Sequence, residues 1–333
     1  MTRFSRLRFL APVLPLVIAV CTVAFAIRQQ QSPDVPAWPF PASPADHLVA
    51  DSAGVHRVPN SGARFTLRQA IDRFSPPDWH PRGHPPMPDV VARGRRPNLA
   101  ACAYCHLPNG EGRPENATLA GLSESYIIAQ LADFRSSARR SVMPGYAPGN
   151  AMHAVAMNAT EEDVVAAARY FSALPSTRRV RVIEAARIPR MRQAAFVYAR
   201  IPGAGTEPIG SRIVEGPPNF ERHELRDDAM AYVAYVPPGS IERGRVIATT
   251  GTSGIATACV TCHGARLLGT AVIPRLAGQY PTYIVRQLLA FKTGARATPA
   301  SQPMQAVVAQ MSTAEMIAVA AYAGSLAPTA RSR

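Results

Sequence analysis

Two cysteine–histidine motifs are the residues of this chain whose types and spacing could support chemistry. In each motif two cysteines stand three positions apart and a histidine follows at once. The motifs lie in "NLAACAYCHLPNGEG" and "ATACVTCHGARLLG" and comprise Cys102, Cys105 and His106, and Cys259, Cys262 and His263. Motifs of this kind serve as zinc ligands, as redox dithiols or as thioether attachment points for haem.

Haem attachment explains this pattern of residues better than either alternative. A structural zinc ion needs four ligands, often from two paired motifs, and a histidine directly after the second cysteine points badly for one tetrahedral ion. A redox dithiol of this type belongs in a βαβ context, whereas the residues around both motifs have helical spacing. In CxxCH the two thiols add to the porphyrin vinyl groups and the next imidazole reaches the iron. The sequence therefore predicts two covalently bound haem c groups.

The chain also repeats itself, which places the two motifs at equivalent points. Cys102 and Cys259 are separated by an offset that also aligns "YIIAQLADFRSSAR", at 126–139, with "YIVRQLLAFKTGAR", at 283–296. Further on, the first copy has extra residues in the loop "RSVMPGYAPGN". We therefore predict two homologous modules, module one at 90–176 and module two at 238–328.

Both modules have the pattern of small helical domains. Apolar residues in 283–291 recur at steps of three and four, as on one face of a helix. Each module should close with a helix that begins with a capping box, formed by Thr160 and Asp163 in module one and by Ser312 and Glu315 in module two. The predicted fold class is all-α.

The N-terminal residues, 1–27, predict export. Arginines precede residues 9–27, which carry no charge and would span about 28 Å as a helix, close to a bilayer. Ala24-Phe25-Ala26 resembles a signal cleavage site, so a cleaved signal sequence and an uncleaved anchor both remain open. The length favours the anchor. With little positive charge after it, the rest of the chain is expected in the periplasm, held at the inner membrane if the helix is uncleaved.

Two further segments separate these parts and are expected to be irregular. Residues 28–89 are rich in proline and polar residues and predict an extended N-terminal arm, with Trp38 and Trp79 fixing it to the body. Residues 177–237 form a linker that could hold short strands or drape over the modules. The fifth cysteine, Cys21, lies in the N-terminal apolar run, so no cysteine remains for a disulfide.

The charge of the chain bears on its partners. The formal net charge is +14, and Lys292 is the only lysine. The arginines are scattered, with no basic stripe interleaved with aromatic residues, so a nucleic-acid partner is not expected. A basic surface suits an acidic protein partner. Apart from His153, the histidines outside the motifs have no spacing typical of ligands: His47, His56, His80, His84 and His223.

Four segments of module two resemble the class I cytochrome c domain: "CVTCHGARLLG", "PRLAGQ", "YIVRQLLAFKTGAR" and "MSTAEMIAVAAYAGSL". The whole chain resembles bacterial di-haem cytochromes c made of two such domains in tandem, the c-four-like type. The resemblance implies helices around each haem in an apolar crevice. It also implies that a proline carbonyl accepts the hydrogen bond of the axial histidine, a position held by Pro274 in module two and by Ala117 in module one.

The same resemblance implies a methionine as the second axial ligand of each iron. In the family this methionine precedes the last helix, eight residues ahead of the capping serine or threonine. That register gives Met152 in module one and Met304 in module two, beside His106 and His263 as the first ligands. The alternatives that remain open are Met143 in the longer loop of module one, Met157, Met311 and, for bis-histidine ligation, His153.

A ligand pair of this kind predicts electron transfer without a bound small-molecule substrate. The expected donors are a quinol-oxidising complex or a dehydrogenase, and the expected acceptors are a terminal oxidase or reductase. One alternative is a cytochrome subunit of a membrane-associated dehydrogenase complex. The other is a di-haem peroxidase, which needs an iron with a displaceable ligand and an acid or base close to it.

Overall fold

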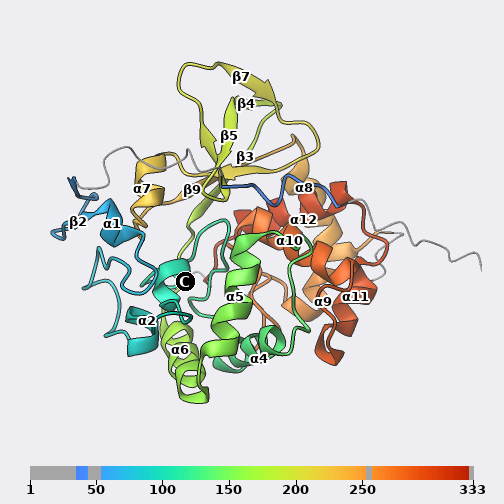
Figure 1. The fold of residues 1–333 in the computed structure, drawn as a ribbon. Coiled ribbons are helices and arrows are strands. Elements are labelled where there is room, and N and C mark those ends of the chain that lie inside the picture. Colours follow the sequence, from blue (N-terminus) through green and yellow to red (C-terminus); the bar gives the residue numbers. More distant parts are fainter. Residues whose placement is uncertain (1–34, 44–53, 253–256, 330–333) are drawn as a thin grey trace, which may run out of the picture. The chain divides into compact units, whose positions relative to one another are not determined.

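Two bundles of short helices lie side by side, one for each half of the repeat (Figure 1). The computed structural model describes residues 35–43, 54–252 and 257–329, which all belong to one unit beginning at Val35. The predicted signal or anchor at 1–27 lies outside the described residues, as do Cys21 and His47.

The helices follow the order that the repeat predicts. Module one contains α3 (Cys102–His106), α4 (Glu124–Arg135), α5 (Ala147–Asn158) and α6 (Glu161–Ala173). Module two contains α8 (Ser240–Thr250), α9 (Cys259–His263), α10 (Pro281–Lys292), a 3-10 turn (Pro299–Ser301), α11 (Gln302–Val308) and α12 (Thr313–Ser325). Both predicted capping boxes are present. The backbone N–H of Asp163 donates to the Thr160 hydroxyl at 3.2 Å, and that of Glu315 to Ser312 at 3.3 Å.

Module two is held together by a close crossing of its first and last helices, α8 and α12. Gly244 of α8 lies so near α12 that a Cβ atom there would stand 1.9 Å from the carbonyl oxygen of Ala318. The absent side chain is therefore what allows the crossing. In module one α6 packs on α4 and on α2 (Asp89–Ala92), which is a single turn.

We expect Gly244→Ala to lower the free energy of unfolding by about 2 kcal/mol, because the two helices must separate to admit the methyl group. Denaturant unfolding followed by circular dichroism would measure the loss. Gly145→Ala is the matched control, since a Cβ at Gly145 would meet nothing within 4 Å. Equal stability of the two variants would contradict this account of the crossing.

The predicted all-α class describes the two modules but not residues 177–237, where the sequence leaves short strands open and the structure has them. This connecting segment forms a three-stranded sheet in the order β3 (Val180–Glu184), β9 (Tyr232–Val236), β8 (Val214–Gly216), with β3 and β9 parallel. It also forms two antiparallel pairs, β4 (Arg187–Pro189) with β7 (Thr206–Pro208), and β5 (Met191–Ala194) with β6 (Val197–Arg200). Buried and half-buried residues alternate along β9, which is the period of a strand packed on one face.

The described part of the N-terminal arm lies along module one and the connecting segment. It contains β1 (Val55–His56), β2 (Phe65–Thr66) and α1 (Leu67–Ala70). Trp79 fixes it as expected: its side chain is 1% exposed and its indole N–H donates to the carbonyl of Leu225 at 2.7 Å. Trp38 packs against the core of module two, and its carbonyl accepts from the hydroxyl of Tyr198 at 3.1 Å. The arm thus packs on the rest of the unit at both points.

Candidate functional site

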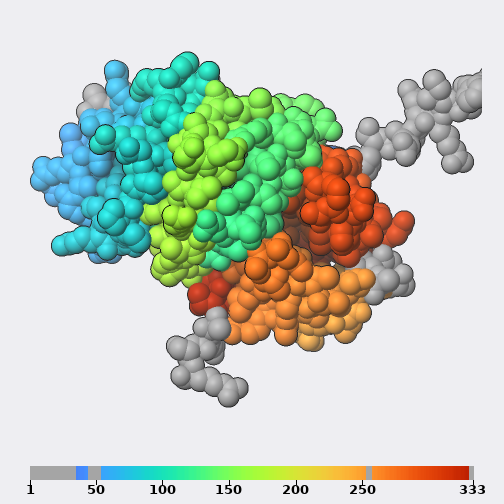
Figure 2. All heavy atoms as spheres, turned by 90° about the horizontal axis from the view of Figure 1, so that it is seen from below, coloured from blue at the N-terminus to red at the C-terminus, as the bar shows by residue number. Residues whose placement is uncertain are grey.

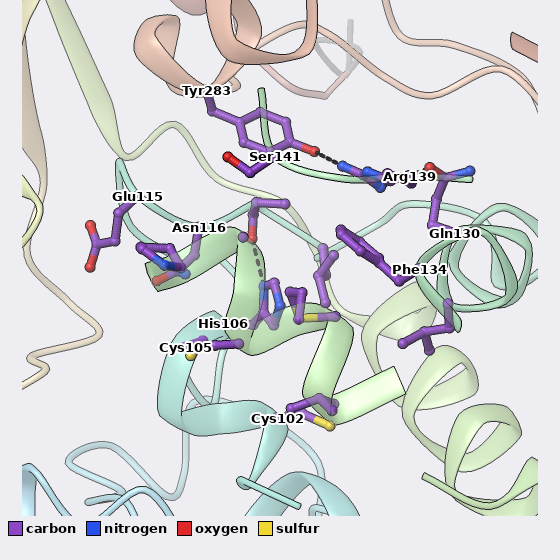
Figure 3. Close-up of a pocket in the computed structure, with 18 of the residues that line it drawn as sticks. Cys102, Cys105, His106, Glu115, Asn116, Gln130, Phe134, Arg139, Ser141 and Tyr283 are labelled. Carbon is purple, nitrogen blue, oxygen red and sulfur yellow. Dashed lines mark hydrogen bonds between the residues drawn. The ribbon is translucent and has the colours of Figure 1, made fainter. Parts of the chain in front are cut away.

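A cavity of about 400 Å³ opens beside the first CxxCH motif (Figure 3). Cys102, Cys105 and His106 line one side of it, at the helix α3. Helices α4, α5 and α6 contribute mainly apolar residues to the remaining wall, and loops of module one supply most of the rest. Helix α10 of module two completes the wall with Tyr283 and its neighbours, so the first cavity depends on both modules.

Each motif histidine is buried and oriented by a backbone carbonyl. His106 donates its Nδ1–H to the carbonyl of Ala117 at 2.9 Å, and His263 donates to that of Pro274 at 2.8 Å. The replacement of proline by alanine in module one therefore keeps the carbonyl. Burial lowers the pKa of His106 to about 4 and also lowers that of His263. Both imidazoles are neutral at pH 7 with Nε2 left to bind a metal, which is the form a metal ligand requires.

Three of the four motif cysteines are poorly suited to redox exchange. Burial raises the pKa of the Cys102 thiol to about 12 and raises those of Cys105 and Cys259. A reactive dithiol needs the opposite shift, because the thiolate is the nucleophile. Among the described residues, the group with the geometry to hold a metal ion is His80 with Asp227 and Asp228, and it includes neither motif.

The structure places Met152, His153 and Met157 on α5 and Met304 on α11, whereas Met143 and Met311 lie outside helices. Met152 lies on α5 and lines the same cavity as His106, whereas Met143 is not among the residues that line it. His153 is exposed and donates its Nδ1–H to the carbonyl of Phe134 at 2.8 Å. Met157 is 55% exposed. Of the methionines considered as ligands of the first iron, Met152 is thus the one that lines the same cavity as His106.

In module two, Met304 lies on α11 at the register equivalent to Met152. It is half-buried and packs against the core of that module, close in sequence to Met311. Met311 is only 2% exposed and belongs to the core itself. Its carbonyl accepts from the Lys292 ammonium at 2.6 Å.

A pair of buried arginines joins the modules with approximate two-fold symmetry. Arg139 donates to Gln130 of its own module at 2.7 Å and to Gln287 of the other at 2.9 Å. Arg296, its equivalent, donates to the same two glutamines at 2.6 and 3.1 Å. Arg139 also donates to the hydroxyl of Tyr283 at 3.0 Å (Figure 3). The two guanidinium groups are therefore shared between the modules.

Neither of these buried cations has a carboxylate partner within ion-pair distance among the described residues. Arg139 and Arg296 are 7% and 8% exposed, and their hydrogen-bond partners are neutral glutamine and tyrosine side chains. Burial alone would raise the pKa of Tyr283, and the two guanidinium groups more than offset this and lower it. Buried cations of this kind need an anion nearby. Arg139 lines the first cavity, where the carboxylates of a haem would supply it.

Sequence reasoning missed this arginine cluster, although its signal was visible. The aligned segments 126–139 and 283–296 share a tyrosine, a glutamine, a phenylalanine and an arginine at equal positions. The two shared phenylalanines, Phe134 and Phe291, lie under the guanidinium groups at 4.5 and 4.2 Å. Because the same glutamine and arginine occur at equal positions of both helical segments, a contact between the two segments could have been expected.

These features fit haem in both halves of the chain. The first cavity offers two thiols for thioether bonds, an apolar wall and cationic groups at its edge, and each half supplies a neutral buried imidazole on a CxxCH helix. The fold and the sites therefore define a c-type haem protein with two modules.

Comparison with known proteins gives the family. The family model described as cytochrome c matches residues 91–175 and again 243–327, so the chain belongs to the cytochrome c family. It is a di-haem c-type cytochrome, an electron-transport protein with two covalently bound haem c groups. The prediction of two cytochrome c domains in tandem is thereby confirmed.

Two curated relatives cover most of the chain. It is 29% identical over 238 residues to a thiosulfate dehydrogenase electron acceptor of Thiomonas intermedia, covering 70% of this chain and 82% of that protein. It is 23% identical to cytochrome c4 of Azotobacter vinelandii, over 67% of this chain and 83% of that one. A shorter match of 73 residues, 47% identical, joins 21% of this chain to 32% of the thiosulfate dehydrogenase electron acceptor of Stutzerimonas stutzeri.

Two solved structures match the chain at modest similarity. A thiosulfate dehydrogenase from Marichromatium purpuratum aligns with a TM-score of 0.46 and 27% identity over 71% of this chain, which spans 38% of that chain. Cytochrome c4 of Acidithiobacillus ferrooxidans aligns with a TM-score of 0.44 and 25% identity, over 68% of this chain and 98% of the other.

The described histidines of the arm each pair with a carboxylate. His80 is hydrogen-bonded to Asp228 at 2.5 Å, His84 to Asp78 at 3.2 Å and His56 to Glu221 at 3.0 Å. In the part of the chain that the structure describes, no single helix has the length and apolar composition to cross a membrane. One sharply bent pair, Pro299–Val308 with Thr313–Ser325, meets that test on length and composition alone.

Proposed function

We propose that this chain is a periplasmic carrier that takes single electrons from a dehydrogenase oxidising an inorganic sulfur compound and passes them to a terminal acceptor. In this role each iron is held by a histidine and a methionine, His106 with Met152 in module one and His263 with Met304 in module two. The haem supplies reversible one-electron oxidation and reduction. The protein's task is to keep both ligands in place through that cycle.

The observation that carries this proposal is the common cavity of His106 and Met152. The Ala117 carbonyl holds the imidazole in one tautomer and orientation, so its free nitrogen always faces the cavity. Met152 lines the same cavity from α5, and the capped start of α6 follows directly after α5 in the chain. Two protein ligands that stay bound in both redox states leave no open position for a substrate, which favours a carrier over a peroxidase.

The donor is suggested by the names of the relatives. Two proteins similar to this chain are named electron acceptors of thiosulfate dehydrogenase, one of which it matches over 70% of its length. The expected periplasmic location and attachment through residues 1–27 agree with such a donor and stay predictions. We propose that the chain acts either as a free carrier or as the cytochrome subunit of that dehydrogenase.

Reduction by a thiosulfate dehydrogenase tests the proposal. Under anaerobic conditions the oxidised holoprotein should gain the α-band of reduced haem when enzyme and thiosulfate are both added, and not when either is omitted. Ascorbate would show separately that both haems can be reduced. A holoprotein that ascorbate reduces and the enzyme does not would exclude this donor. Rapid turnover of hydrogen peroxide by the same sample would favour the peroxidase alternative.

A further inference from the structure

The connecting segment contains a β-ribbon that lies outside both segments matching the cytochrome c family. Strands β4 and β5 follow one another in the chain and pair with β7 and β6, so residues 187–208 form one two-stranded ribbon. The family matches end at 175 and begin again at 243. In Figure 1 the ribbon extends to the top of the view, with β4 and β7 beyond β3 and β9. The ribbon is therefore an addition to the two cytochrome c domains.

Positive charge without counter-charge gathers on this ribbon. It contains four arginines and one acidic residue, Glu207, whose carboxylate pairs at 3.0 Å with Arg212 just after the ribbon. Arg187, Arg190 and Arg200 are exposed, and none of the three has a carboxylate within ion-pair distance among the described residues. The ribbon thus presents three guanidinium groups that an external anion could reach.

The three arginines surround an uncharged loop. Residues 201–205, "IPGAG", leave the ribbon opposite Arg190, whose backbone N–H and carbonyl are hydrogen-bonded to the two ends of the loop at 3.0 Å. Arg200 directly precedes the loop, and Arg187 donates at 3.0 Å to the hydroxyl of Thr206, which follows it. The two glycines of the loop face open space, because a Cβ at either would meet nothing within 4 Å. Loop and arginines together form one accessible surface.

The chain that follows the predicted anchor lies against the same ribbon. The backbone N–H of Ala42 donates to the side chain of Gln193 in β5 at 2.8 Å, and the hydroxyl of Tyr198 in β6 donates to the carbonyl of Trp38 at 3.1 Å. Only seven residues, 28–34, separate the predicted anchor from the first described residue. A chain of that length spans at most about 30 Å. An N-terminal anchor would therefore keep the ribbon close to the lipid.

We propose that Arg187, Arg190 and Arg200, with the loop 201–205, bind the anionic phospholipid headgroups of the membrane from which the chain extends. The proposal rests on the proposed attachment at the inner membrane. A guanidinium group makes paired hydrogen bonds to phosphate, and each arginine close to an anionic lipid surface strengthens binding about fivefold. Contact at the ribbon leaves the opposite face, which the helices of the two modules form, turned away from the lipid (Figure 2).

Vesicle binding of the assembled holoprotein tests this contact. A protease site placed within 28–34 allows the purified, folded holoprotein to be cut outside the unit that begins at Val35. The probes are vesicles of phosphatidylcholine alone and of equimolar phosphatidylcholine and phosphatidylglycerol, sedimented with the cut protein at low ionic strength. We expect binding to the anionic vesicles alone, weakened about fivefold by Arg190→Gln and about fivefold by Arg200→Gln. Arg169→Gln, on the exposed face of α6, is the matched control and should bind like wild type.

Salt and the full-length chain complete the test. High salt should release the cut protein, because it screens the attraction. In full-length holoprotein held in nanodiscs, the amides of residues 197–208 should exchange hydrogen more slowly when phosphatidylglycerol is present. Equal sedimentation with both kinds of vesicle, or equal weakening by Arg169→Gln, would overturn the proposal. No electron donor takes part, so the proposed donor can fail without affecting this result, and the reverse also holds. The cut protein gives the same answer whether or not residues 1–27 are removed in the cell.

Discussion

Replacing Met304 with alanine should remove the methionine–iron absorption of one ferric haem and lower its midpoint potential by on the order of 0.1 V or more, because a thioether ligand favours the reduced iron. Met152→Ala should do the same to the other haem, and the double variant should lose the band entirely. Visible spectroscopy and a spectroelectrochemical titration of the holoprotein would measure both effects. Two separate losses are expected because the two methionines lie in different modules.

The rival methionines provide the controls. Met143→Ala should keep the full band, since Met143 does not line the cavity that contains His106. Met311→Ala should keep it as well and instead lower stability by about 2–5 kcal/mol, because its side chain is buried in the core of module two. A band that survives in the Met152→Ala variant but disappears in Met143→Ala would move the ligand of module one into the longer loop.

Features encoded over short distances along the chain were predictable from the sequence. The CxxCH spacing brings two thiols and an imidazole together on one turn of helix, and no distant contact is needed to specify it. The capping boxes at Thr160 and Ser312 are equally local, since donor and acceptor are three residues apart. The family follows from these local patterns occurring twice at one offset.

Features that depend on distant pairing were not predictable in the same way. Strand β3 pairs with β9, which lies more than forty residues later, and each is only five residues long. Alternation in "YVAYV" was compatible with a strand, but no local sequence pattern predicted which strand it would pair with. The contact of the connecting segment with the first CxxCH loop is similar, because Arg226 donates to the carbonyl of Tyr104, 122 residues away. A single arginine in a polar segment carries no sign of such a contact.

The same distant contacts make the two halves unequal. A repeat predicts two equivalent modules, and the inner geometry is nearly equivalent, with each histidine bound to one carbonyl at 2.9 or 2.8 Å. The connecting segment then covers the CxxCH loop of only one of them, while its strands β3, β8 and β9 pack on the core of the other, module two. Its β8 also reaches module two through Glu215, whose carboxylate accepts from the backbone N–H of Thr282 at 2.9 Å and from the Thr282 hydroxyl. This carboxylate caps the start of α10.

Burial of this cap makes stability depend on pH. Glu215 is 1% exposed, and burial raises its pKa from 4.5 to about 7. Between these values the folded protein binds a proton that the unfolded chain has released, so stability falls as pH rises from about 4.5 to 7. The shift corresponds to about 3 kcal/mol lost across that range. Above pH 7 the folded state holds a buried charge, and below 4.5 the cost is absent.

Glu215→Gln should therefore be more stable than wild type at pH 8 and no more stable at pH 4.5. The stability of the variant relative to wild type should change by about 3 kcal/mol between the two pH values. The new amide also places a donor where Glu215 Oε1 has no hydrogen-bond partner, which costs about 1 kcal/mol at either pH. Denaturant unfolding of the holoprotein at each pH measures it. Glu184→Gln is the matched control, because Glu184 accepts from Ile241 N–H at the start of α8 at 2.7 Å but is exposed. If both variants respond to pH equally, the buried carboxylate is not the source of the dependence.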